Sequence, residues 1–324
     1  VFEDEVKTPF KPESFFSNYK KFERESRVIG PQAYEPRFSF NNLITSFAID
    51  PIRGFSILLE TEINDLLENH RLNGGVLTKT DFRSGQIYGE YQFLKYWMDF
   101  HVRFDRNVYL IDAIQEGDLV QKYTLNRIEV GAALPVTNTV RFEFSPFYAS
   151  TNFNNLNWEA VINANTGTVL APDSRVEYGG FRGAMVIDNT IEKGFNIYQG
   201  TRGLIEYENY LGISDFQKSF SKLNVDLRHY RKLHRELTFA SRVFYGRSMG
   251  SNKQNYLLGG MDNWLFNQYE DQGVNDPIAM ANSRDNSDIL FAEFVTNLRG
   301  FDYNELFGTN AVVFNAELRW PVFR

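Results

Sequence analysis

Apolar and polar side chains alternate with a period of two along many separate stretches of this chain. The pattern is clearest in four segments: 99–105, 139–145, 222–228 and 312–322. In the second of these, the apolar positions are Val140, Phe142 and Phe144. Successive side chains of an extended strand point to opposite faces, so each segment is predicted to be a strand with one apolar and one polar face. The repetition predicts an all-β chain.

The length and polarity of these segments favour a transmembrane barrel. They run for about 10–15 residues, which suits the ~9–11 residues that a tilted strand needs to cross a bilayer. Their polar faces carry full charges in mid-strand, including Glu90, Arg103, Glu143 and Asp226. In a membrane barrel the apolar face meets lipid and the polar face lines the interior. The side chains expected to face lipid include Val140, Phe142, Phe144, Val225 and Leu227.

Aromatic residues gather at the ends of the predicted strands and make up 16% of the chain. Those at strand ends are Tyr96, Trp97, Tyr109, Phe147, Tyr148, Trp320 and Phe323. Membrane barrels carry girdles of aromatic side chains at both membrane–water interfaces. We therefore expect these residues to lie in such girdles.

Alternation places about twelve antiparallel strands along the chain. They are expected near 37–50, 53–63, 71–80, 85–95, 98–111, 119–134, 138–150, 174–188, 197–210, 217–231, 235–247 and 310–323. The first and the eighth alternate poorly. Short turns and long loops segregate to opposite ends in outer-membrane barrels, so loops 151–173 and 248–309 are expected on the extracellular side. The turns near 65–70 and 189–196 are expected on the periplasmic side.

Residues 1–36 differ from the rest of the chain. They are charged, contain four prolines and show no sustained period. We interpret them as a linker or a plug-like periplasmic segment that precedes a transmembrane barrel at 37–324.

Composition and motifs exclude several functions. The chain has no cysteine, which excludes disulfides, thiolate metal sites and cysteine nucleophiles. Its net charge of −7 argues against a nucleic-acid partner. The histidines lack HExxH spacing, and no GxSxG or Walker sequence occurs, so we expect no enzyme, no catalytic residue, no metal site and no cofactor. The mid-strand carboxylates Glu90, Glu143, Glu206 and Glu208 are expected to pair across strands with Arg103, Arg141 or Arg228.

A motif near the end of the chain is more specific. Arg299, Gly300 and Phe301 are followed by a turn that contains Gly308 and by a strand in which residues 317–321 read ELRWP. The order and spacing resemble the closing portion of the BamA-like outer-membrane assembly and translocation superfamily (the "Omp eighty-five" family). Its members carry Arg-Gly-Phe/Tyr at the tip of the sixth extracellular loop.

A second segment, 64–70, is similar to a turn of family barrels that are fused behind a periplasmic β-propeller. Glu68 stands where that turn has Gly.

The resemblance implies a sixteen-stranded barrel, of which this chain would supply about twelve strands, in the bacterial outer membrane. It implies that the barrel inserts other outer-membrane proteins or transports polypeptides, using a lateral seam between its first and last strands. The implied partners are outer-membrane lipid, unfolded outer-membrane or secreted polypeptide clients, and accessory lipoproteins.

The resemblance also implies that Arg299 reaches into the lumen and pairs with an acid on the wall. Strand parity places Glu317 and Arg319 on the inner face. We therefore expect Arg299 to pair with Glu317, with Arg319 helping to keep that carboxylate ionised. Gly300 would allow a tight turn at the tip of the loop, and Phe301 would add apolar contact.

Two other functions fit the alternation. A passive porin or solute channel would let small solutes diffuse and would have no protein client. A soluble, aromatic-rich carbohydrate-binding β domain would be extracted without detergent.

Overall fold

The computed structural model describes residues 34–50, 54–80, 82–113, 119–156, 173–194, 197–235, 237–261, 287–295 and 298–320. The chain divides into two compact units, Val1–Arg37 and Phe38–Arg324, and nearly all of the described residues belong to the second. The predicted linker at 1–36 lies almost wholly outside the described residues. Among the helices of the described ranges, none is long and apolar enough to cross a membrane.

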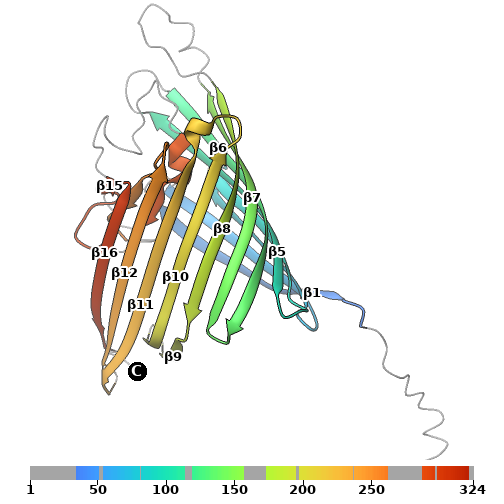
Figure 1. Ribbon diagram of the computed structural model, residues 1–324, viewed down its shortest axis with the longest axis vertical. Helices are drawn as coiled ribbons and strands as arrows, with labels where there is room; N and C mark the ends of the chain where they lie inside the picture. The colour runs from blue at the N-terminus through green and yellow to red at the C-terminus, as the bar shows by residue number, and fades with distance from the viewer. Residues whose placement is uncertain are drawn as a thin grey trace, which may run out of the picture. The chain divides into compact units, whose positions relative to one another are not determined.

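The second unit is built around one large antiparallel sheet (Figure 1). Its strands, in spatial order, are β1 (Phe38–Asp50), β2 (Gly54–Asp65), β3 (His70–Lys79), β4 (Gly85–Phe93), β5 (Asp99–Ala113), β6 (Leu119–Thr137), β7 (Val140–Asn155), β8 (Ser174–Asp188), β10 (Ile197–Gly212), β11 (Phe220–His234), β12 (Leu237–Gly250) and β16 (Asn310–Arg319). The short strand β9 (Ile191–Gly194) pairs with β10 and completes the 13 strands of the sheet. The all-β antiparallel prediction is confirmed. Each expected strand coincides with one in this order, whereas the sequence predicts only a turn at β9.

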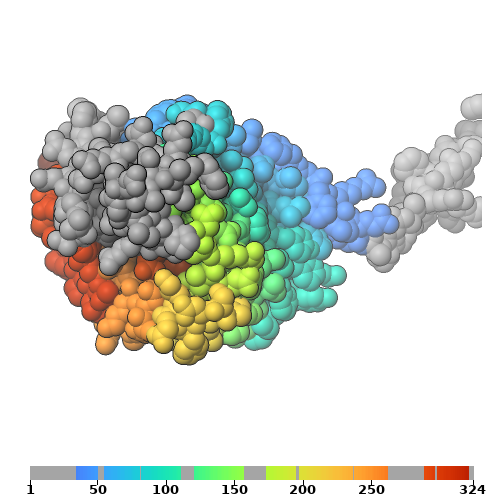
Figure 2. Space-filling model, turned by 90° about the horizontal axis from the view of Figure 1, so that it is seen from above, coloured from blue at the N-terminus to red at the C-terminus, as the bar shows by residue number. Residues whose placement is uncertain are grey.

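Hydrogen-bonded pairing runs without a crossover from β1 to β16. Within the described ranges, β1 pairs only with β2, and β16 only with β12. Seen from above, the sheet curves from β1 in blue through green and yellow to β16 in red (Figure 2). Because neighbouring strands are antiparallel, the β7–β8 and β12–β16 connections lie at one end of the sheet and the β2–β3 turn lies at the other.

The two faces of the sheet differ in chemistry. We call the face that carries Phe142 the outer face and the face that carries Glu143 the inner face. On β7, Phe142 and Phe144 are 46% and 57% exposed on the outer face. Between them, the Glu143 side chain is only 14% exposed on the inner face, where it is ion-paired. The remaining residues assigned to the outer face are exposed or partly buried: Val140, Val225 and Leu227. An exposed apolar surface that spans many strands requires an apolar partner.

A β-bulge explains the poor alternation of β1. The register of β1 against β2 shifts between Phe40 and Asn42, so one extra residue is inserted there. The insertion changes the parity of the sequence but preserves the face, because Phe40 before the bulge and Leu43 and Phe47 after it are all exposed. The irregular alternation in the sequence therefore comes from one strand whose apolar residues share the outer face and whose register is shifted once by the bulge.

The poor alternation of β8 has a different cause. Val176 and Tyr178 are buried on the inner face, where they belong to an apolar cluster that includes residues of the β12–β16 connection. Phe147 lies in the same cluster at 6% exposure, and Tyr109 packs against it. The expectation that these two aromatics form an interfacial girdle is wrong, because parity with Glu143 turns Phe147 inward. The other strand-end aromatics are exposed, except Phe323, which lies outside the described residues: Tyr96, Trp97, Tyr148 and Trp320.

A charge on the outer face should be costly. Replacing Phe142 by Arg is expected to lower the free energy of unfolding by about 2–4 kcal/mol, because the guanidinium would enter hydrocarbon. The matched control, Thr139→Arg in the β6–β7 turn, should change it by no more than about 0.5 kcal/mol. Urea unfolding in lipid vesicles measures both. Equal effects at the two positions would mean that this face does not meet the membrane interior.

Candidate functional site

The connection between β12 and β16 folds into a small sheet of its own. Its described elements are β13 (Tyr256–Leu258), the 3₁₀ helix η3 (Ser287–Phe291), β14 (Glu293–Val295) and β15 (Leu306–Gly308). β13 lies in the middle, parallel to β14 and antiparallel to β15. An isolated bridge between Gly260 and Leu298 extends this pairing toward the Arg-Gly-Phe motif. The described part of the connection is therefore folded, which the alternation in the sequence does not indicate.

The segment 287–295 packs against the inner face of the large sheet. The Phe291 ring lies 5.0 Å from Phe220, 5.1 Å from Tyr210 and 5.3 Å from Tyr178, measured between ring centroids. These wall residues come from β11, β10 and β8. Each aromatic side chain buries a large apolar area, and such ring geometries add further attraction. The inner face is therefore aromatic where Phe291 packs against it.

Strand β13 is held to the wall by a second contact. The Tyr256 hydroxyl donates to Asn224 Oδ1 on β11 at 2.7 Å. Its ring lies against Gly246 of β12, where an added Cβ would overlap the ring. Glycine at this position allows the ring to approach the backbone of the wall closely.

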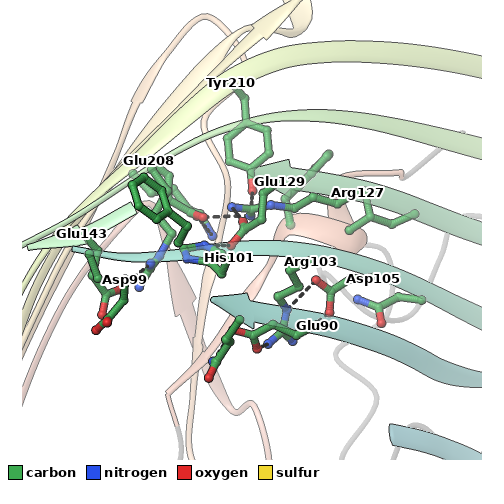
Figure 3. A pocket seen from close by; sticks show the side chains of 18 of the residues that line it. Glu90, Asp99, His101, Arg103, Asp105, Arg127, Glu129, Glu143, Glu208 and Tyr210 are labelled. Carbon is green, nitrogen blue, oxygen red and sulfur yellow. Dashed lines mark hydrogen bonds and ion pairs between the residues drawn. The ribbon is translucent and has the colours of Figure 1, made fainter. Parts of the chain in front are cut away.

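Beside this apolar region, the inner face encloses a charged cavity of about 810 Å³ (Figure 3). Arg127 of β6 lines this cavity and contacts Glu129 at 2.7 Å and Glu208 of β10 at 2.9 Å. It also donates to the Tyr210 hydroxyl at 2.9 Å, and its guanidinium carbon lies 4.1 Å from the centre of the Phe147 ring. Charged hydrogen bonds and a cation–π contact together compensate the burial of this side chain.

Other inward charges are also paired. Arg103 contacts Asp105 on its own strand, β5, at 2.7 Å and Glu90 on β4 at 3.4 Å. Arg182 of β8 bridges Glu143 on β7 and Glu206 on β10. The pairs of Arg103 with Glu90 and of Arg182 with its two partners join different strands, so they cross-link the wall as well as neutralise it.

The expected partners of the mid-strand carboxylates are partly correct. Arg103 does pair with Glu90 across β4 and β5. Arg141 contacts Glu143 at 2.7 Å, but the two residues lie on the same strand, β7, so this pair does not cross strands. Arg228 instead contacts Asp226, two residues earlier on β11, at 2.9 Å. The principal cations of the network, which sequence reasoning missed, are Arg127, Arg182 and Lys222. Their inward parity was available as a signal. One partner of each, however, lies far away in the sequence: Glu208 for Arg127, Glu143 for Arg182 and Glu293 for Lys222.

The Arg-Gly-Phe motif lies beside the last strand. Arg299 Nη2 is 3.7 Å from Glu317 Oε1, and the Arg299 side chain is 68% exposed. Glu317 also accepts from Arg319 Nη2 at 2.9 Å. Gly300 has φ +88°, in the left-handed region that favours glycine. The carbonyl of Phe301 accepts from the Gly260 amide at 3.2 Å, while the Phe301 side chain is exposed.

Other positions singled out in the sequence show no chemistry of a metal centre. Among the described residues, no group of His, Asp and Glu could hold a metal ion. His101 faces the charged cavity, 3.4 Å from Glu129. Glu68 has φ +53° in the β2–β3 turn, at the position where the propeller-linked turn has Gly.

Comparison with known proteins supports the fold. No family model matches the sequence, and no curated protein does. CdiB from Escherichia coli is similar in structure, with a TM-score of 0.52 and 10% identity over 88% of this chain and 54% of that chain. The chain has the fold of CdiB. This likeness supports the predicted antiparallel β fold and extends to the fold alone.

A second match is BamA from Haemophilus ducreyi lacking POTRA domains 1–3. Its TM-score is 0.48 with 11% identity, over 67% of this chain and 42% of that chain. The chain thus spans about half the length of the structures that it matches.

The Arg127 network should dominate the stability of the wall. Arg127→Met is expected to lower the free energy of unfolding by about 3–5 kcal/mol, because it leaves buried carboxylates without their main partner. Arg141→Met removes a half-exposed guanidinium and should cost about 0–1 kcal/mol. Urea unfolding in vesicles compares the two. A loss at Arg127 no larger than at Arg141 would show that the network contributes little.

Proposed function

We propose that this chain forms part of a bacterial outer-membrane barrel that assembles other outer-membrane proteins or moves polypeptides across the membrane. The clients would be unfolded outer-membrane or secreted polypeptides, and accessory lipoproteins would assist. Catalysis and cofactors have no part in this proposal. The energy would come from folding of the client.

One observation carries the proposal. The connection before the last strand folds onto the inner face and presents Arg299 beside Glu317, at 3.7 Å, on that strand. A loop that returns into the interior and carries Arg-Gly-Phe at its tip is what the resemblance to the BamA-like superfamily implies. The fold shared with CdiB supports the same interpretation.

The two ends of the sheet suggest the mechanism. Unpaired edges expose backbone donors and acceptors that can template an incoming strand. The bulge in β1 loosens the register on one side. On the other side, β16 exposes Val312, Phe314 and Leu318 toward the outer face. We propose that a client strand enters at a lateral seam between these edges, in contact with lipid, and that further strands of the family barrel complete the wall.

The motif residues would then keep the loop in place. Arg299 would anchor the loop to Glu317, which also contacts Arg319. Gly300 supplies the turn, and Phe301 is free to contact a client or the wall. The outward residues Val140, Phe142, Phe144, Val225 and Leu227 would contact lipid.

A passive channel is the second candidate, favoured by the charged cavity of about 810 Å³. It predicts that vesicles containing the full-length protein leak small solutes but do not promote folding of an added outer-membrane protein. The proposed function predicts promoted folding. Solute leakage without promoted folding would favour the channel.

The anchor can be tested in the same vesicles. Arg299→Ala in the full-length protein is expected to slow client folding up to about fivefold, since an exposed ion pair contributes at most about 1 kcal/mol. The control is Arg175→Ala, because Arg175 is also an exposed arginine with a carboxylate partner. Folding is followed by the heat-modifiable mobility of the client. Equal rates for the two variants would remove the anchor from the proposal.

A further inference from the structure

The segment 287–295 crosses from the apolar region of the inner face to the charged cavity. Ile289, Leu290 and Phe291 are buried in the aromatic cluster. Two residues later, Glu293 borders the cavity, and its side chain is 38% exposed. Glu293 is thus the point at which the inserted segment meets water and wall charges together.

The wall residue opposite Glu293 is a buried lysine. Lys222 of β11 is 6% exposed, and its Nζ lies 3.2 Å from Glu293 and 3.5 Å from Glu208. Arg127 contacts Glu208 as well. Glu208 therefore has two cationic partners, Arg127 and Lys222. Lys222, in contrast, has one partner on the wall and one on the segment 287–295. A buried ammonium with a missing partner is costly, so this lysine favours the inserted position of the segment.

The Arg299–Glu317 ion pair is weaker, judged by the exposure of its side chains and by the distance between them. Arg299 is 68% exposed and 3.7 Å from its partner, so water and salt screen the interaction. Glu317 also keeps Arg319 when Arg299 leaves. Lys222 and Glu293 form a shorter and more enclosed contact.

We propose that the Lys222–Glu293 ion pair is the latch that holds the loop segment 287–295 against the inner wall. Breaking the pair lets the segment leave the aromatic cluster and uncovers the inner faces of β8, β10 and β11. This inference deepens the proposed function, since the same connection carries Arg-Gly-Phe. It rests on the proposed function only for its role and is tested without a client, so its failure is distinct from a failure of that function.

Glu293→Gln is the sharpest variant. It removes the charge on the segment and leaves Lys222 paired with Glu208, so the wall keeps its own contacts. The chain has no cysteine, which makes a single introduced thiol a specific probe. Ile289→Cys reports whether the segment has left the wall, because Ile289 is only 4% exposed while the segment is in place. Labelling of the full-length protein in vesicles by a membrane-impermeant maleimide measures how often the segment opens.

The expected result is an increase of about tenfold or more in the labelling rate of Ile289→Cys when Glu293→Gln is added, given the usual strength of charged hydrogen bonds. Lys222→Met should raise the rate as well. In the Lys222→Met background, Glu293→Gln should then have no further effect, because the two residues act through one contact. An unchanged rate in Glu293→Gln, or an equal increase with and without Lys222, would overturn the proposal.

Two controls separate release of the segment from general unfolding. Glu305→Gln changes an exposed carboxylate of the same connection and should leave the rate unchanged. Ser145→Cys places the thiol at a buried wall position on β7, beside His101. It should stay protected in the Glu293→Gln background, and labelling there would show that the wall itself had opened and would contradict a local latch.

Discussion

The two-residue period of the strands constrains everything else in this structure. Alternate side chains of a strand share a face. A strand that presents apolar residues such as Phe142 on the outer face must therefore present its polar residues on the inner face. Inward charges of neighbouring strands then meet across the sheet, as Glu90 and Arg103 do in directly paired positions. Unpaired charges would be costly in this enclosure. The interior is consequently a network of ion pairs around Arg127 and not a featureless water channel.

The wall residues differ in chemistry where the β12–β16 connection lies against them. Where segment 287–295 covers the wall, inward positions such as Tyr178 and Phe220 are aromatic. Where the wall faces the cavity, they are charged. Lys222 and Glu208 lie at the boundary and belong to both regions. The same wall thus provides an apolar packing surface for the connection and a charged cavity beside it. In our proposal, the ion pairs at the boundary determine how firmly the connection is attached to the wall.

Sequence reasoning succeeded where the signal is local. Alternation located the strands on the path of the sheet, because a two-residue period is set by the backbone itself. It failed where distant segments meet. Parity with Glu143 alone turns Phe147 inward, but nothing near it in the sequence reveals the ring that it packs against, Tyr210 of β10. The contacts of Arg127 with Glu208 and of Lys222 with Glu293 are hidden from sequence reasoning for the same reason. The bulge between Phe40 and Asn42 makes a regular strand look irregular in the sequence.

The central claim is that one face of this sheet meets lipid and the other meets water. Single cysteines at positions 140–145, carrying a nitroxide spin label in the reconstituted full-length protein, test it most directly. Collision with oxygen, which is concentrated in the membrane, should be high at 142 and 144. Collision with a water-soluble nickel complex should be high at 141 and 143. A strand on which both reagents reach all positions equally would contradict the membrane barrel and favour a soluble β domain.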